Sequence, residues 1–470
     1  MSHVEPTRPP GQSMSPSAED RAATPRPSAR RRFRARTHTE LSDPLLRSAY
    51  SLAANSVLTG GLGMAFWIVA ARIYPSDAVG RDSALIAAMV QISTIAQLNM
   101  ANSLVLFMPG RARAGRILIG AYAISALAAV GLGTGFVLVA PHVSEDFAFL
   151  TREPLTGATY VAAVVLWGVF ALQDAALTAM RHAPWALVKN GVFGVLKLLA
   201  LPVLFVLGSA HGSFIAWVVP MCLLLLPVNW LLFRRILIGE RPVLADGTSL
   251  LPSGRRQLTR FLALDYLATV FINTSITILP LLILAILGSR AAAYFYIPLT
   301  VAMALDAMFW GMTTSLVTEA ALAPHRAGEL VRLLVRRVAL LVVPVIVVLI
   351  VVAPLVMAPF GEEYVRESTN VLRILLVASL FRAAMLLAAA LWRLEGRGAR
   401  IAALDGCMLV GLLCATVPLA HALGVTGVAL AWLGTTAAAG CAVVPTLMRY
   451  IRPPAAADAS TASADTTERS

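Results

Sequence analysis

The stretch ARIYPSDAVGRDSAL, residues 71–85, places a Tyr, a Pro, two Asp and two Arg between two long apolar runs. The run before it reads GGLGMAFWIVA, and the run after it reads IAAMVQISTIAQLNMANSLVLFM. A short polar segment between apolar runs of about membrane-spanning length is typical of a turn that joins two transmembrane helices. The stretch therefore predicts a helical hairpin in a membrane.

The composition of the whole chain also indicates a membrane protein. Of the 470 residues, 58% are hydrophobic and only 13% are charged, and the mean hydropathy is +0.76. Soluble domains are closer to about 25% charged. The formal net charge of +13 is typical of Arg-rich cytoplasmic loops and does not predict nucleic-acid binding. The four Cys lie in apolar runs without a CxxC pair or a His cluster, so neither disulfides nor a metal site are expected.

Hydropathy predicts an all-α polytopic protein with twelve transmembrane helices. Each predicted stretch has about the 20 mostly apolar residues that a helix needs to cross the hydrocarbon core. The twelve stretches are 50–73, 83–108, 116–140, 158–180, 186–208, 212–233, 261–287, 292–320, 337–358, 371–392, 399–421 and 426–450.

The basic residues predict which side of the membrane each loop occupies. If the N-terminus is cytoplasmic, 30 of the 38 Lys and Arg residues fall in cytoplasmic segments and six in external ones. This distribution follows the positive-inside rule, so both termini are expected in the cytoplasm and the chain in the cytoplasmic (plasma) membrane.

The longest connection between predicted helices divides the chain into two halves. We expect a disordered basic cytoplasmic tail at 1–48, a six-helix bundle at 49–233 and a cytoplasmic linker at 234–260. A second six-helix bundle at 261–450 and a disordered cytoplasmic tail at 451–470 follow. The first external turns of the two halves, YPSDAVGRDSAL and LGSRAAAYFYIP, align Ser76 with Ser289. Transporters built from repeats have this organisation, with a central cavity where the halves meet.

Several classes of function are excluded because the sequence lacks the motifs or domains that they require. No P-loop GxxxxGK[ST] motif is present, so the chain is not expected to hydrolyse ATP. No loop between the predicted helices is long enough to form a soluble catalytic domain, so an enzyme is not expected. Transport is the function that this layout favours.

Three segments resemble a known family. They are the first hairpin, with Arg72, Tyr74 and Gly80 followed by a cytoplasmic PGR; the segment AAAYFYIPLTVAMALDAMFWGMTTSLVTEAA; and APLVMAPFGEEYV. Over about residues 45–450 the chain resembles polysaccharide-biosynthesis flippases of the multidrug/oligosaccharidyl-lipid/polysaccharide exporter superfamily, which also contains the MATE drug exporters. Two helices and a set of cavity arginines found in peptidoglycan lipid flippases are absent, so that specificity is not expected.

The resemblance implies a fold and a substrate. Two six-helix bundles would enclose a central cavity, as in MATE-like and flippase-like proteins. The cavity would carry a saccharide linked to polyprenyl phosphate or pyrophosphate across the membrane by alternating access, in the biosynthesis of cell-surface polysaccharide such as lipopolysaccharide. Membrane lipids, a polysaccharide polymerase and glycosyltransferases are the expected partners. No cofactor is expected apart from a coupling H⁺ or Na⁺.

Charged residues deep in predicted helices are the first candidates for the site, because such charges are costly in a membrane. Lys197 and Arg382 lie near the middle of the fifth and tenth predicted helices, and Asp306 lies deep in the eighth. Lys197 and Arg382 would bind the anionic phosphate linkage, and Asp306 would couple transport to an ion. The alternative is a structural ion pair between two of the three.

Two further carboxylates and several amides are weaker candidates. Asp174 and Asp265 are ion-coupling candidates, although local pairs with Arg181 and Arg260 would also explain them. Polar stripes on the first, second and seventh predicted helices would bind sugar or form ordinary interhelical hydrogen bonds. Their substrate-binding candidates are Asn55, Gln91, Asn102 and Asn273.

Three functions other than a lipid-linked oligosaccharide flippase remain open. A cation-coupled drug antiporter of the same superfamily would favour an acidic and aromatic cavity. A major-facilitator-type small-molecule transporter would have an Asp among the basic residues after its second helix, and PGRARAGR has none. A membrane scaffold that transports nothing would have no need for charged residues in mid-membrane.

Overall fold

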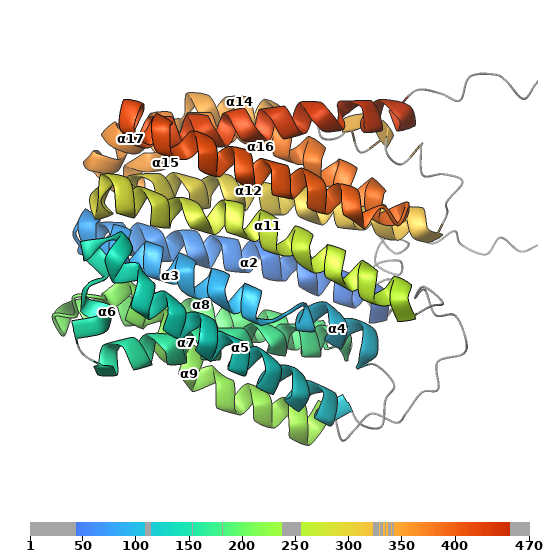
Figure 1. Ribbon diagram of the computed structural model, residues 1–470, viewed down its shortest axis with the longest axis horizontal. Coiled ribbons are helices and arrows are strands. Elements are labelled where there is room, and N and C mark those ends of the chain that lie inside the picture. The colour runs from blue at the N-terminus through green and yellow to red at the C-terminus, as the bar shows by residue number, and fades with distance from the viewer. Residues whose placement is uncertain are drawn as a thin grey trace, which may run out of the picture. The chain divides into compact units, whose positions relative to one another are not determined.

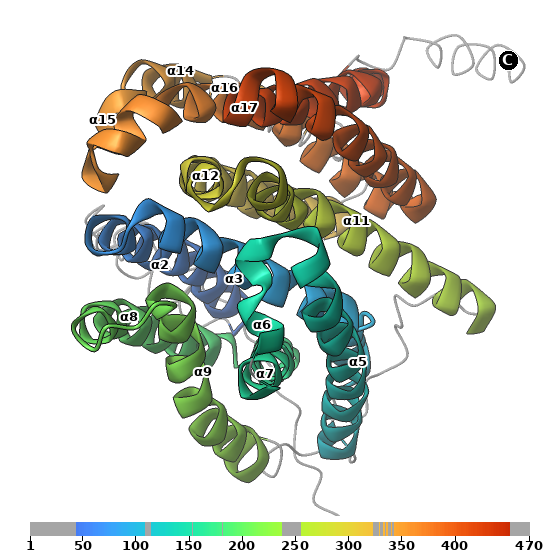
Figure 2. The ribbon, with the colours of Figure 1, turned by 60° about the vertical axis from the view of Figure 1, so that its left-hand side comes forward.

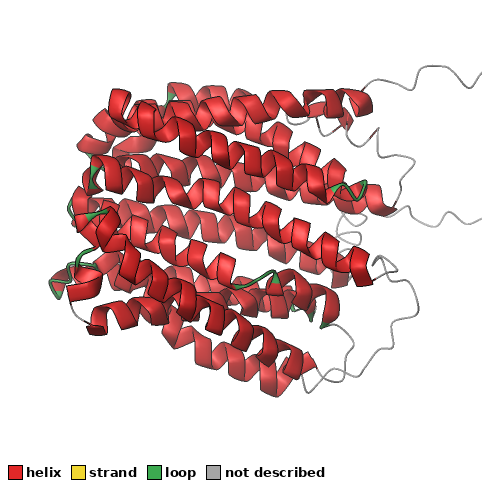
Figure 3. Cartoon of the chain, in the orientation of Figure 1, coloured by secondary structure: helices red, strands yellow, loops and turns green. Residues whose placement is uncertain are grey.

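The computed structural model describes residues 44–108, 114–152, 154–180, 182–236, 255–322 and 343–451, together with a few positions between 329 and 340. Within these ranges every regular element is helical, as Figure 3 shows. Residues from Tyr50 onward form one compact unit. The predicted tails and the predicted linker lie mostly outside the described residues.

The first half of the chain contains the predicted hairpin and the helices that follow it (Figure 1). Its second predicted helix differs from the expectation. The helix begins earlier, at Ser76, and is broken at Leu98 and Asn99, whose backbone φ angles are +46° and +62°. The helices are α2 (Pro44–Ile73), α3 (Ser76–Ala96), α4 (Met100–Phe107), α5 (Ala114–Val143), α6 (Phe149–Arg152), α7 (Pro154–Ala179), α8 (Ala183–Val206) and α9 (Gly212–Leu231).

The second half also contains one broken and one merged element. The ninth predicted helix is described as two short helices, α14 (Val343–Val351) and α15 (Ala353–Met357), the latter continued by a 3₁₀ turn, with a bend of 74° between them. The last two predicted helices form α17 (Gly398–Ile451), with a kink at Gly424, where φ is +60°. The other helices are α11 (Arg255–Leu287), α12 (Ser289–Leu322) and α16 (Glu362–Leu394).

These helices make the chain a polytopic membrane protein. In the described residues, seven helices are long and apolar enough to cross a membrane, or eight if α14 and α15 with its 3₁₀ turn form one bent span. α2 has a shorter apolar part, Leu58–Ile73. The all-helical membrane fold is therefore confirmed, whereas a total of twelve spans remains a prediction.

The two halves meet through α3, which packs against α11 and α12. In Figure 2, α8 and α9 lie on one side of α2 and α3, and α16 and α17 lie on the far side of α11 and α12. Large side chains at the α3–α11–α12 contact are buried, among them Leu85, Met89, Leu279, Ile283 and Phe295. In a membrane, helices associate mainly through such close van der Waals packing.

The hairpin of residues 71–85 is tighter than its polarity alone suggests. α2 ends at Ile73 and α3 begins at Ser76, so only Tyr74 and Pro75 lie between the helices. The aligned serines, Ser76 and Ser289, each begin a helix. A Cβ atom on Gly80 would lie 1.7 Å from the backbone oxygen of Ser289, so only glycine allows α3 and α12 to approach this closely.

Candidate substrate cavity

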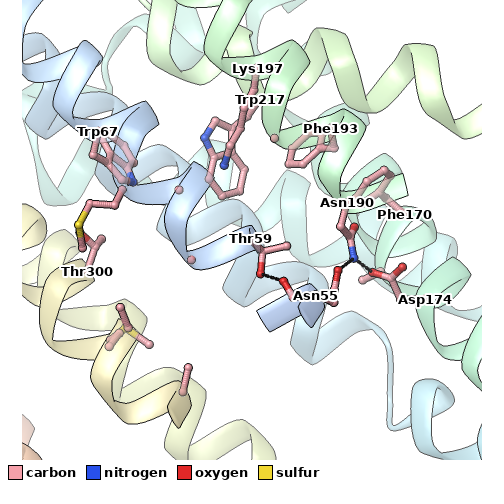
Figure 4. A pocket seen from close by; sticks show the side chains of 18 of the residues that line it. Asn55, Thr59, Trp67, Phe170, Asp174, Asn190, Phe193, Lys197, Trp217 and Thr300 are labelled. Atoms are coloured by element: carbon pink, nitrogen blue, oxygen red, sulfur yellow. Dashed lines mark hydrogen bonds between the residues drawn. The ribbon is translucent and has the colours of Figure 1, made fainter. Parts of the chain in front are cut away.

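A cavity of about 520 Å³ lies between helices of the first half and α12 of the second. Small residues of α2 make room for it, since no other heavy atom lies within 4 Å of where a Cβ on Gly60 or Gly63 would sit. Figure 4 shows the cavity from close by. Its polar and aromatic lining residues are Asn55, Thr59 and Trp67 from α2; Trp167, Phe170 and Asp174 from α7; Asn190, Phe193 and Lys197 from α8; Trp217 from α9; and Tyr296 and Thr300 from α12.

One region of the cavity combines a single cation with aromatic rings. Lys197 is only 6% exposed, and its Nζ lies 4.2 Å from the ring centre of Trp217 and 5.0 Å and 5.3 Å from those of Phe66 and Phe193. Among the described residues, no carboxylate lies within ion-pair distance of this ammonium group, and the buried Nε1 of Trp217 has no acceptor. Figure 4 shows the Lys197 and Trp217 side chains close together at the cavity. The Lys197 ammonium group is therefore a charge that an anion could balance.

Another region of the cavity holds a network of amides and charges. The Asn190 side-chain amide donates to Asn55 Oδ1 and to Asp174 Oδ2, both at 3.2 Å. Lys189 Nζ lies 2.8 Å from Asp174 Oδ1 and donates to the Phe170 backbone oxygen at 2.7 Å. The Lys189 ammonium therefore balances the charge of the only carboxylate among the described lining residues.

The ion pair of Asp174 differs from the expected one. Its observed partner is Lys189, whereas the sequence favoured Arg181, which lies outside the described residues. Lys189 is one of the 30 basic residues assigned above to cytoplasmic segments, and it lies inside α8 with its side chain 1% exposed. The helix that begins at Ala183 turns this lysine toward Asp174 and Phe170 of α7.

Arg382 does not line the cavity with Lys197. Its guanidinium group forms a buried ion pair with Asp306, which joins α16 to α12, and lies 5.3 Å from the ring centre of Trp432. Asp306 is also absent from the cavity lining. The structural ion pair that the sequence left open is therefore present, and the expectation that Lys197 and Arg382 act on one phosphate is not supported by their positions.

The other predicted polar residues connect helices at the junction between the halves. Gln91 of α3 bonds to Thr274 and Thr277 of α11. Asn102 of α4 donates to Asp265 of α11 at 2.7 Å.

Asn273 donates to the backbone oxygen of Thr269, one turn earlier in its own helix. None of Gln91, Asn102, Asp265 and Asn273 lines the cavity. Their contacts are those of interhelical and intrahelical hydrogen bonds, the alternative reading of the polar stripes. The partner predicted for Asp265, Arg260, has no described side chain.

The aromatic part of the lining and its glycines were not predicted from the sequence. Trp67, Trp217 and Tyr296 come from three helices that no local pattern brings together. A signal was nevertheless present in GGLGMAFW, residues 60–67, because a run of glycines next to aromatics within one membrane helix leaves space beside large rings. Asn55, Asp174 and Lys197 are the predicted site residues that the structure brings together at the cavity.

Comparisons with known proteins identify the fold. No family model matches the chain, and no curated protein matches it. An inward-facing structure of a multidrug resistance MATE family transporter of the MOP superfamily has a TM-score of 0.60 at 16% identity, covering 84% of this chain and 94% of that one.

Two further solved structures lead to the same conclusion. An outward-facing conformation of a multidrug resistance MATE family transporter has a TM-score of 0.56 at 15% identity, covering 87% of this chain and 95% of that one. A structure of the MATE multidrug transporter DinF-BH has a TM-score of 0.55 at 16% identity, covering 87% and 96%. The chain therefore has the fold of the MATE transporters, as the sequence predicted, and identities this low establish the fold alone.

Proposed function

We propose that the protein is a membrane transporter that moves an amphipathic anionic substrate by alternating access, and that the substrate is a lipid-linked oligosaccharide or polysaccharide precursor. The observation that carries the proposal is Lys197, a deeply buried ammonium group without a carboxylate partner among the described residues, at a cavity between the two halves. A charge is retained in such a place at considerable cost, and intramembrane charges commonly mark substrate pathways.

The chemistry of the cavity matches the parts of such a substrate. An anionic phosphate linkage accepts hydrogen bonds from Lys197 and Trp217, and these are strong because the surrounding rings exclude water. The amide groups of Asn55 and Asn190 offer donors and acceptors to sugar hydroxyls. The protein would operate in the cytoplasmic membrane with both termini inside, beside the glycosyltransferases and polymerase that make and use the saccharide.

Coupling to H⁺ or Na⁺ is part of this proposal. Each candidate carboxylate is engaged: Asp174 with Lys189, Asp306 with Arg382, and Asp265 with Asn102. Protonation or cation binding at any of them would weaken a contact between helices. Such a step would favour one conformation over another, as coupling requires.

A cation-coupled drug antiporter is the second candidate. The aromatic lining supports it, and so do the matched structures of multidrug transporters. The charge of the cavity argues against it: among the described lining residues Asp174 is balanced by Lys189, and the charge that remains, on Lys197, would repel a cationic drug. A major-facilitator-type transporter would have a fold different from that of the matched MATE structures.

Transport in proteoliposomes tests the proposal. Wild-type protein is compared with Lys197→Met and Lys197→Arg, with a fluorescent polyprenyl phosphate-linked saccharide as one substrate and a cationic dye as the other. We expect the wild type to move the lipid, Lys197→Met to slow it at least about tenfold, and Lys197→Arg to retain part of the rate. Equal rates in wild type and Lys197→Met, or transport of the dye alone, would overturn the proposal.

A further inference from the structure

Within the described part of the chain, the charges around the cavity add up to a single uncompensated positive charge. Among the described lining residues the acidic and basic side chains are Asp174 and Lys197. Asp174 is balanced by Lys189, whose ammonium lies 2.8 Å away. Of the charges that the structure describes there, Lys197 is therefore the one that a substrate must balance.

We propose that the cavity selects lipids whose saccharide is joined through a single phosphate, with one negative charge, over lipids joined through a pyrophosphate, with two. This inference rests on the proposed function and narrows it, since both linkages were open on sequence grounds. A phosphodiester has one acidic oxygen, whereas a pyrophosphate diester has two. In a site of low dielectric constant, a charge without a counter-charge costs several kcal/mol.

No second cation is available among the described residues to balance a pyrophosphate. Lys189 is already held by Asp174 and by the backbone oxygen of Phe170, and its side chain is 1% exposed. Arg382 is held by Asp306 in the other half, outside the cavity lining. Recruiting either residue would leave a carboxylate uncompensated.

The groups around Lys197 can also balance only one phosphate. The ammonium group lies beside the faces of Trp217, Phe66 and Phe193, and these rings offer no further acidic or basic group. The buried Nε1–H of Trp217, on one of these rings, has no acceptor among the described residues. A buried donor without an acceptor is costly, so filling it on substrate binding is favourable. The second phosphoryl group of a pyrophosphate would lie among aromatic surfaces instead.

A pair of lipids that differ only in the linkage tests the inference. Both carry the same polyprenyl chain and the same sugar, one through a phosphate and one through a pyrophosphate, and wild-type protein is assayed with each in proteoliposomes. We expect transport of the phosphate-linked lipid to have at least about a tenfold higher kcat/KM.

Adding a second positive charge should reverse the preference. Thr300 and Ala304 of α12 line the cavity opposite the helices of the first half. Thr300→Lys is expected to shift the ratio toward the pyrophosphate lipid by about tenfold, with Thr300→Gln as the uncharged control. Ala304→Lys serves the same purpose if Thr300→Lys does not fold.

Each result has a distinct meaning. A wild type that moves the pyrophosphate lipid as fast as the phosphate lipid, or faster, overturns the inference and leaves the proposed function intact. A wild type that moves neither lipid but exports a cationic dye overturns both. An unchanged ratio in a folded lysine variant contradicts the charge argument.

Discussion

Two deep cations, one in each half of the molecule, have opposite surroundings. Lys197 in the first half lies at a cavity among aromatic rings, without a carboxylate partner in the described part of the chain. Arg382 in the second half forms a buried ion pair with Asp306. Both residues look alike in the sequence, as basic residues in mid-helix. The difference shows that the neighbouring helix decides whether such a charge stabilises the fold or remains available to a ligand.

The largest effect is expected when the second-half ion pair is broken. Arg382→Gln leaves Asp306 buried without its counter-charge, and breaking one partner of a buried pair costs about 3–5 kcal/mol. We expect the free energy of unfolding in detergent to fall by that amount. The double variant Arg382→Gln/Asp306→Asn should recover most of the loss. A single variant as stable as the wild type would show that the pair does not support the fold.

A smaller effect is expected at the ion pair beside the cavity. Lys189→Met removes the hydrogen bond to the Phe170 backbone oxygen and the charge that faces Asp174. Hydrogen bonds to charged groups contribute about 1.5–3 kcal/mol, and the Asp174 side chain is 34% exposed, so water partly compensates its charge. We expect a loss near the lower end of that range. A loss as large as that of Arg382→Gln would mean that water is excluded from Asp174 as completely as from the Arg382–Asp306 pair.

The smallest effect on stability, and one of opposite sign, is expected at Lys197. Lys197→Met replaces a buried charge without a partner by an apolar side chain of similar length. The free energy of unfolding should stay unchanged or rise by about 1 kcal/mol, while transport falls. A marked loss of stability would indicate that Lys197 has a structural role like that of Arg382, and the contrast between the halves would disappear.

The features of the molecule that depend on local composition could be predicted from the sequence. Apolar runs and the polar hairpin at residues 71–85 were sufficient for an all-helical membrane protein. Lys197 was found because a charge deep in a predicted membrane helix is costly, and Asn55 because it belongs to a polar stripe on the first predicted helix. The break at Leu98–Asn99 was missed, because neither residue is Gly or Pro, the usual markers of a break in a helix.

Contacts between distant segments could not be predicted. The partner of Arg382 lies 76 positions away along the chain, and the Lys189–Asp174 pair depends on how α7 and α8 are rotated. The aromatic residues around Lys197 come from α2, α8 and α9, and only packing brings them together. Single-helix patterns therefore indicated which residues are unusual but not which of them meet.

The most direct measurement is a structure of the protein with a bound polyprenyl phosphate-linked saccharide, determined by electron cryomicroscopy in lipid nanodiscs. We expect density for the phosphate group within about 3 Å of Lys197 Nζ, with the Arg382–Asp306 pair intact. A phosphate bound at Arg382, or a substrate that leaves Lys197 without an anionic partner, would contradict it.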